Sequence, residues 1–137
     1  MYKIILVTLD GTPTDRAIIE HIKQLARFGH SRVVLLHVAD GWAARTHGAD
    51  AVSPEITQDT AYLAEVRAEF EAFGIPASSE LAYGEPAKEI IKWVEQKGCD
   101  LVAMSTHGHR FVKDILFGSV ANEVRHRARI PVLLLKA

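Results

Sequence analysis

Polar residues and glycines gather in one stretch that follows an apolar run in the second half of the chain. Residues 105–110 are Ser-Thr-His-Gly-His-Arg, and nine residues separate Gly108 from the pair Gly118 and Ser119, where a helical pattern begins. Gly108 permits positive φ and close backbone approach, while Gly118 and Ser119 would present free amides at a helix N-terminus, where the dipole favours anions. The stretch is a candidate phosphate site. Ser119 could instead only cap the helix, and the two roles can coexist.

Three apolar runs end in polar or small residues that a parallel sheet would bring together. In an open parallel sheet, the ligand crevice lies outside the carboxyl ends of the strands. We therefore expect a crevice formed by Thr8, Asp10, Gly11 and Thr12 after the first run, His37 and Val38 after the second, and Ser105, Thr106, His107 and Gly108 after the fourth.

Asp10 allows two interpretations. Its carboxylate could accept hydrogen bonds from a ligand's ribose or from neighbouring loop amides. Asp before Gly also commonly closes an Asx turn by bonding its own backbone, and Pro13 suits the first turn of a following helix. Spacing alone does not decide between the ligand and the turn.

The histidines suggest phosphate contacts rather than a metal site. His107 and His109 could donate to phosphate oxygens, and with His47 they could also be considered as metal ligands. Structural zinc sites favour four ligands that include Cys, whereas the single Cys99 precedes the fourth apolar run at its opposite end. We expect no protein-bound metal. His37 lies in an apolar run, which is more typical of a hydrogen-bonded core histidine than of a ligand.

Familiar catalytic motifs are absent from the sequence. It contains no GxxxxGK[ST] loop, no GxGxxG after the first apolar run and no GxSxG elbow. No pair of carboxylates is placed by spacing alone to do acid–base chemistry. No enzyme class stands out.

The elements that must position these residues alternate along the chain. Short β-branched and aliphatic runs alternate with helical stretches, which is typical of a parallel sheet covered by helices on both faces. Right-handed crossovers favour a doubly wound α/β fold in the strand order 3-2-1-4-5, with the ligand between strands 1 and 4. The predicted strands are residues 3–8, 32–38, 77–83, 100–105 and 131–135.

Helical periodicity fills the intervals between the predicted strands. Three helices are expected to end near Gly29, Gly74 and Gly98. A fourth helix, before the last strand, is expected to point Val120, Val124 and Ala128 inward. One irregular insertion, residues 39–54, is either a lid over the crevice or a surface loop of no consequence.

Composition limits the class of protein. The 137 residues, 48% hydrophobic, suit one domain over residues 1–137. The 16 Lys and Arg against 17 Asp and Glu give a formal net charge of -1 without a long charge run, which argues against nucleic-acid or membrane-surface binding. No apolar stretch approaches the roughly 18 residues of a membrane span, so we expect a cytoplasmic protein. Cys99 is expected to be a buried, inert thiol.

Several of these segments together resemble the universal stress protein family over nearly the whole chain. They are residues 7–12 (VTLDGT), 36–38 (LHV), the stretch from Ser105 to Ser119, and 131–134 (PVLL). Nucleotide-binding members of that family carry a motif of Gly, two residues, Gly, nine residues, then Gly and Ser or Thr. Here Gly108, Gly118 and Ser119 match that motif, and Ser105 replaces its first glycine.

The resemblance implies an ATP-binding α/β fold and assigns a role to each matching residue. Asp10 and Val38 would lie against adenosine, Met104 and Ser105 near the ribose, and the residues around the phosphates would be Gly108, His109, Gly118, Ser119 and Val120. ATP, ADP or AMP could be the preferred form, and the phosphates could hold Mg²⁺ or Mn²⁺. Serine at the first glycine position could narrow the pocket or add a hydrogen bond.

Three functions follow from this resemblance. The first is an ATP-binding regulatory protein of the stress response, the second a slow ATPase or autophosphorylating enzyme, and the third a dimeric interaction module with a vestigial pocket. Family members are commonly dimers. The apolar strand at 131–135 would lie at the edge of the sheet, where pairing with a second copy would cover it.

Overall fold

A computed structural model gives the fold of the protein and describes residues 1–39, 54–106 and 119–136. Five parallel strands in this part of the chain form one sheet in the order β3-β2-β1-β4-β5. The predicted strand order is confirmed, and every predicted strand end lies within one residue of the observed end. The elements are β1 (Ile4–Thr8), α1 (Asp15–Gly29), β2 (Arg32–Ala39), α3 (Pro54–Ala72), β3 (Ala77–Tyr83), α4 (Pro86–Lys97), β4 (Leu101–Ser105), α5 (Ser119–Arg127) and β5 (Val132–Leu135).

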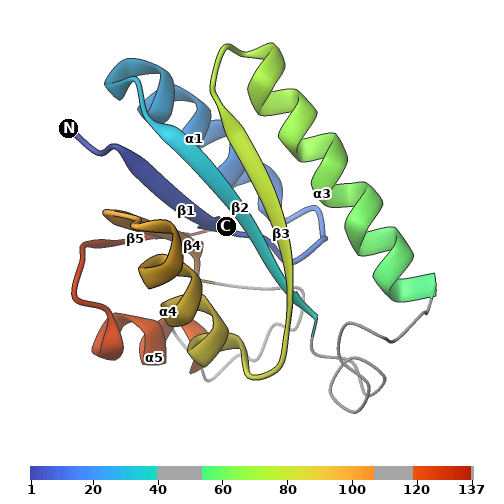
Figure 1. The fold of residues 1–137 in the computed structure, drawn as a ribbon, viewed down its shortest axis with the longest axis vertical. Coiled ribbons are helices and arrows are strands. Elements are labelled where there is room, and N and C mark those ends of the chain that lie inside the picture. The colour runs from blue at the N-terminus through green and yellow to red at the C-terminus, as the bar shows by residue number, and fades with distance from the viewer. Residues whose placement is uncertain (40–53, 107–118, 137) are drawn as a thin grey trace.

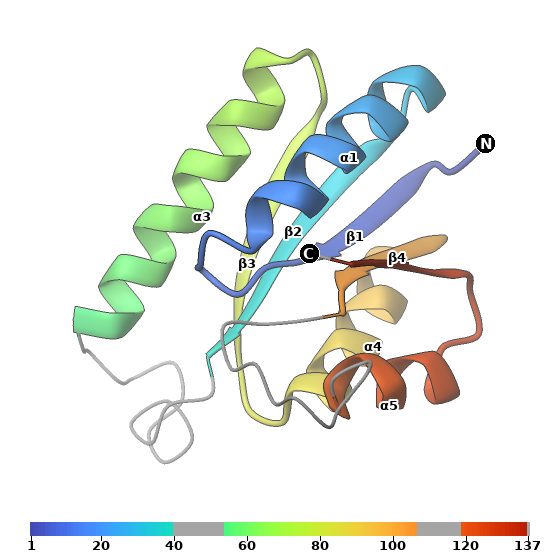
Figure 2. The same cartoon turned by 180° about the vertical axis from the view of Figure 1, so that it is seen from behind.

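Helices cover both faces of the sheet, as the sequence predicts. Figure 1 shows α4 and α5 in front of the strands, and Figure 2, seen from behind, shows α1 and α3 on the opposite face. We call these the α4–α5 face and the α1–α3 face. With β1 at its centre, the architecture is the doubly wound α/β fold.

Apolar side chains fill the space on both faces of the central strands. On β1 and just beyond it, Ile5, Val7 and Leu9 join the core of the α1–α3 face, while Leu6 joins the core of the α4–α5 face. Successive side chains of a strand point to opposite faces, so a strand covered on both sides needs a continuous apolar run. This requirement explains why the strands were recognisable from the sequence.

All three predicted helix ends are confirmed, although only two of the glycines adopt a left-handed conformation. Gly98 follows α4 with a φ of 65°, and Gly74 lies just beyond α3 with a φ of 86°. At α1, Gly29 is the last helical residue, and the left-handed position belongs to His30 with a φ of 53°. The amide of His30 bonds back to the helix end, which offsets part of the roughly 1 kcal/mol that this conformation costs a residue with a Cβ.

The last helix turns slightly differently from the prediction. Val124 is buried as expected, but Ala121 takes the second buried position. Val120 and Ala128 are half-buried and pack at the margin of the same core. The three predicted residues therefore face the core, and Ala121 is a further buried position that the prediction did not include.

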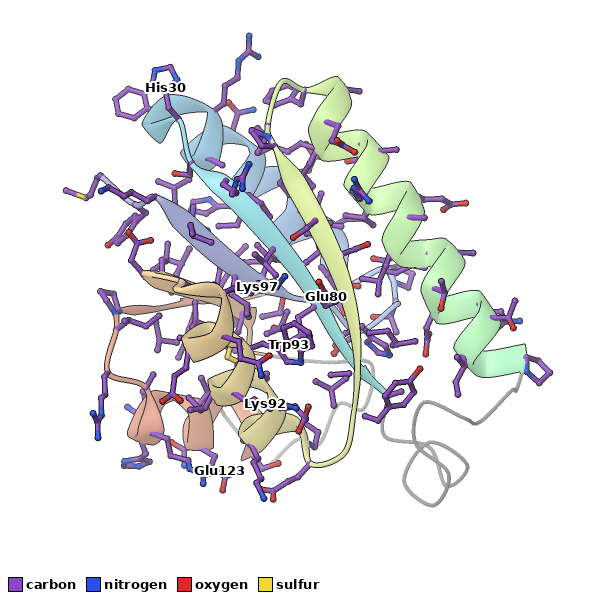
Figure 3. All side chains as sticks on the ribbon, viewed as in Figure 1. His30, Glu80, Lys92, Trp93, Lys97 and Glu123 are labelled. Atoms are coloured by element: carbon purple, nitrogen blue, oxygen red, sulfur yellow. The ribbon has the colours of Figure 1, made fainter. Side chains whose placement is uncertain are left out.

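The helix α4 is fixed over the β3 side of the sheet by side chains near its C-terminus. Trp93 packs against the core of the α4–α5 face, and the Lys97 ammonium lies 5.6 Å from the centre of its ring. The same ammonium is 3.2 Å from the carboxylate of Glu80 on β3 (Figure 3). These contacts hold α4 over the half of the sheet that is formed by β2 and β3.

Two further expectations concern Cys99 and membrane spans. Cys99 is 6% exposed, and its burial raises the pKa of the thiol to about 11, so the prediction of a buried thiol is confirmed. Within the described residues, no helix combines the length and apolar character needed to cross a membrane.

A charge network joins α1 to α3. Both guanidinium nitrogens of Arg16 bond the two carboxylate oxygens of Glu69, at 3.0 and 2.7 Å, and the Lys23 ammonium also contacts Glu69. Glu20 bonds Arg16 and Lys23 from the same helix. The hydrogen bond from Arg16 is the main cause that lowers the pKa of Glu69 to about 2. This network keeps α3 beside α1, and α3 in turn contacts the candidate site.

We predict that Glu69→Gln destabilises the protein by about 1 kcal/mol at pH 7, a value reduced for the partial exposure of the pair. Because folding lowers the pKa of Glu69 from 4.5 to about 2, its contribution is present above pH 4.5 and is lost as the pH falls toward 2. Urea unfolding at several pH values measures the difference in unfolding free energy between the wild type and Glu69→Gln. The wild type and Glu69→Gln should converge at low pH, and Glu71→Gln, an exposed change on the same helix, is the control. A constant difference at all pH values would contradict the prediction.

Candidate functional site

The loop between β1 and α1 is held by a buried carboxylate. Asp15, the first residue of α1, is 2% exposed and accepts hydrogen bonds from the amides of Asp10, at 2.9 and 3.1 Å, and Gly11, at 2.8 Å. Gly11 has a φ of 81°, a left-handed conformation that favours glycine. The two loop amides therefore point inward to Asp15, and the Asp10 side chain is exposed at the edge of the sheet.

Tyr62 from α3 completes the surroundings of the Asp15 carboxylate. Its hydroxyl donates to Asp15 Oδ2 at 2.7 Å across 47 residues of sequence. Burial and the bond to Asp15 both raise the pKa of Tyr62, so its hydroxyl stays protonated and remains a donor. A buried carboxylate needs such donors, because a buried charge without partners is costly.

His37 makes a second connection between this loop and α3. Its Nδ1 lies 2.7 Å from the carbonyl oxygen of Leu9, so Nδ1 must carry a proton and donate. Its Nε2 lies 3.2 Å from Asp59 Oδ2, which is within ion-pair distance, although Oδ2 accepts no hydrogen bond of good geometry in the described residues. The two side chains are therefore in close polar contact without a hydrogen bond. The prediction of a hydrogen-bonded histidine is confirmed.

The predicted site residues on the strands divide between the two faces of the sheet. Strand alternation puts Thr8, Val38 and Met104 on the α4–α5 face, where Met104 is buried and Val38 packs against the core. Ser105 shares the α1–α3 face with Ala103. The register pairs Thr8 with Leu36 and Val7 with Ala103, so all of these residues reach the same carboxyl edge.

Ser105 carries a buried hydroxyl that has no partner among the described residues. Its Oγ is inaccessible to solvent and makes no hydrogen bond with any residue that the structure describes. A buried hydroxyl without a partner is uncommon, because losing its hydrogen bonds to water costs free energy. The residue that replaces the first motif glycine is thus a candidate for bonding a ligand.

Two of the predicted phosphate contacts lie at the start of α5. Ser119 is exposed as the first residue of α5, and Val120 follows it, half-buried. The insertion at 40–53 also lies outside the described residues, so its interpretation as a lid stays a prediction. The other predicted phosphate contacts, which likewise lie outside the described residues, are His107, Gly108, His109 and Gly118.

Sequence reasoning missed Asp15, which binds the loop amides, and the two α3 side chains Asp59 and Tyr62, which contact His37 and Asp15. Asp59 and Tyr62 are three residues apart on α3 and so lie on the same side of that helix. The only available signal was an acidic residue five positions after Asp10, which gives no information about α3. Across the described residues, no group of three or more His, Cys, Asp or Glu side chains could hold a metal ion.

The arrangement suits a ligand that is both apolar and polar. The exposed Asp10 carboxylate can accept hydrogen bonds, the half-buried Val38 offers apolar surface, and Ser105 carries a buried hydroxyl. Pockets that bind small molecules commonly combine apolar walls with a few placed polar groups. None of the residues in this set forms a nucleophile–base pair.

Comparison with known proteins identifies relatives along the whole chain. The model of the universal stress protein family matches residues 1–136. The universal stress protein MJ0577 of Methanocaldococcus jannaschii is 29% identical over 155 residues, covering 99% of this chain and 96% of that protein. Its solved structure matches with a TM-score of 0.81 at 30% identity, covering 100% of this chain and 97% of that one.

Two more distant structures share the fold and were solved with nucleotides. A universal stress protein in complex with cAMP matches with a TM-score of 0.76 at 18% identity, covering 98% of this chain and 97% of that one. The universal stress protein of Archaeoglobus fulgidus in complex with dAMP matches with a TM-score of 0.74 at 22% identity, covering 98% of both chains.

Proposed function

The chain belongs to the universal stress protein family, and on that premise we propose that it binds an adenine nucleotide at the carboxyl edge of the sheet, between β1 and β4. The observation that carries the proposal is the topology. The chain runs from β1 toward β2 on one side and from β4 toward β5 on the other, so the loops after β1 and β4 diverge. Ligands of doubly wound folds bind at such a switch point.

The side chains at this point support a nucleoside. Val38 would contact the apolar base, the exposed Asp10 carboxylate would accept a hydrogen bond from a ribose hydroxyl, and Met104 would lie near the ribose. The hydroxyl of Ser105, which has no partner among the described residues, would gain one from the ribose or from the first phosphate. Thr8 lies beside them at the end of β1.

The start of α5 supports a site for the phosphates. The helix spans Ser119–Arg127, and its N-terminus offers amides and the positive end of its dipole. In the matching motif, Gly108 and Gly118 would let phosphates approach the backbone, with donors from His107, His109 and Ser119. A divalent ion such as Mg²⁺ would be held by the phosphates.

The two nucleotide complexes support the choice of base. Both cAMP and dAMP carry an adenine and a phosphate at the 5′ position, and both are bound by proteins of this fold. We propose a regulatory role in which the bound nucleotide changes the contacts of the protein with its partners in the cytoplasm. Turnover is not required for this role.

Native mass spectrometry of the purified protein tests the proposal directly. We expect a population with the added mass of AMP, ADP or ATP, or its appearance on addition of ATP. A phosphate-release assay then separates a protein that holds ATP from a slow ATPase. A chain that stays ligand-free with millimolar ATP would contradict the proposal and favour an interaction module.

We predict that Gly118→Val abolishes ATP binding and leaves the fold intact. A branched side chain would occupy the space where a phosphate must approach the backbone. Calorimetry measures the affinity, and circular dichroism verifies the fold. Ala72→Val, an exposed change at the distant C-terminal end of α3, is the control. Unchanged affinity in a folded Gly118→Val protein would rule out the phosphate site.

We predict that Ser105→Gly preserves or strengthens ATP binding, because it restores the residue of the family motif and removes a buried hydroxyl that has no partner in the described part of the chain. The affinity is measured by calorimetry against the wild type. A loss greater than about tenfold, or roughly 1.4 kcal/mol, would show that the hydroxyl makes a contact of its own with the ligand.

We further propose that the chain forms a homodimer through β5. In the described part of the chain, β5 pairs only with β4, so its outer edge has free amides and carbonyls. All four of its side chains are apolar and half-buried, with Val132 and Leu134 on one face and Leu133 and Leu135 on the other. Antiparallel pairing of two copies about a two-fold axis would close this edge.

We predict that Leu134→Lys weakens this dimer, because a charge would be placed in or beside the joined strands at a cost of several kcal/mol if it is fully buried. Sedimentation equilibrium should give a dimer for the wild type at tens of micromolar and a larger monomer fraction for the variant. Leu81→Lys, on the opposite edge strand, controls for the general effect of a new charge. A monomeric wild type would rule out the proposed dimer.

A further inference from the structure

Three consecutive residues of the candidate site have their backbone groups bound by side chains. The carbonyl of Leu9 accepts from His37, and the amides of Asp10 and Gly11 donate to Asp15. These bonds fix the direction in which the chain leaves β1. The position of the Asp10 carboxylate therefore depends on the two side chains that hold its neighbours.

Both of those side chains are themselves held by α3. Tyr62 donates to Asp15 at 2.7 Å, and Asp59 lies 3.2 Å from His37. A Cβ added at Gly11 would lie 3.6 Å from Asp59 Oδ1, so the helix also lies directly against the loop. Asp59 and Tyr62 thus contact, from one side of one helix, both side chains that bind the backbone of the three loop residues.

The surroundings of these contacts limit water and competing partners. Asp15 is almost fully buried, and the side chains of His37 and Asp59 are only 15% and 16% exposed. Tyr62 packs its ring against the core of the α1–α3 face. Hydrogen bonds to charged groups in such surroundings are stronger than those at the surface.

We propose that Tyr62 and Asp59 are positioning residues for the nucleotide loop, so that the placement of α3 sets the conformation of Leu9–Gly11 and with it the affinity for the nucleotide. The coupling to affinity rests on the proposed function, whereas the control of the loop does not. A partner or ligand that displaces α3 would then change nucleotide binding without touching the nucleotide.

The test uses Tyr62→Phe, which removes one hydroxyl and keeps the packed ring. The control is Tyr2→Phe, the same chemical change in a ring that packs on the same core. Amide hydrogen exchange at Asp10 and Gly11 is measured by nuclear magnetic resonance in the absence of nucleotide. We expect exchange to rise about tenfold in Tyr62→Phe, as expected for a weakened bond to a charged group, and to stay unchanged in Tyr2→Phe.

ATP affinity is then measured for the same proteins and for Asp59→Asn, which keeps the shape of Asp59 and removes its charge. We expect about threefold to tenfold weaker binding in Tyr62→Phe and Asp59→Asn, with the fold intact by circular dichroism.

Unchanged exchange at Asp10 and Gly11 in Tyr62→Phe would overturn the inference. Faster exchange with unchanged affinity would overturn the coupling. A wild type that does not bind ATP would refute the proposed function, and the exchange data alone would then decide the role of Tyr62.

Discussion

The carboxylate of Asp15 is the group on which the geometry of the carboxyl edge depends. It lies at the first residue of α1, where the helix dipole favours a negative charge, and it is almost fully buried. Two loop amides and the hydroxyl of Tyr62 satisfy its oxygens. Removing one partner of a buried charge typically costs several kcal/mol. Loop conformations that lose a hydrogen bond to Asp15 are therefore disfavoured. The position of the exposed Asp10 side chain is therefore set by the hydrogen bonds from the loop amides to Asp15.

The rest of the fold maintains this arrangement from both sides. The buried apolar faces of β1 and β2 fix the level at which the strands end, so Leu9 and His37 come within hydrogen-bonding distance. On the far side of the loop, the Arg16–Glu69 pair keeps α3 beside α1, and α3 then presents Tyr62 to Asp15. Packing of the sheet and the ion pairs between α1 and α3 thus both fix the conformation of the loop between β1 and α1.

The sequence was sufficient for the fold because each central strand had to be apolar on both faces. Crossover handedness then left few strand orders, and the predicted one is correct. The left-handed His30 after α1 escaped prediction because a neighbouring glycine gave the stronger signal. Asp15 and Tyr62 escaped it for a different reason. Their contact joins residues 47 positions apart, and no periodic pattern reports which polar side chains meet across two helices. Ser105 was identified as unusual, but only the structure showed that its buried hydroxyl bonds none of the residues at 1–39, 54–106 and 119–136.

The central claim is that an adenine nucleotide binds where the β1 loop, the end of β2 and the end of β4 meet. The most direct test is a titration of the isotope-labelled protein with ATP, followed through its backbone amide resonances. The account predicts saturable shifts at Asp10, Gly11, Val38 and Ser105, with little change at the opposite edge of the sheet around Lys3 and Asp100. An absence of shifts at millimolar ATP, or shifts confined to residues far from this edge, would contradict it.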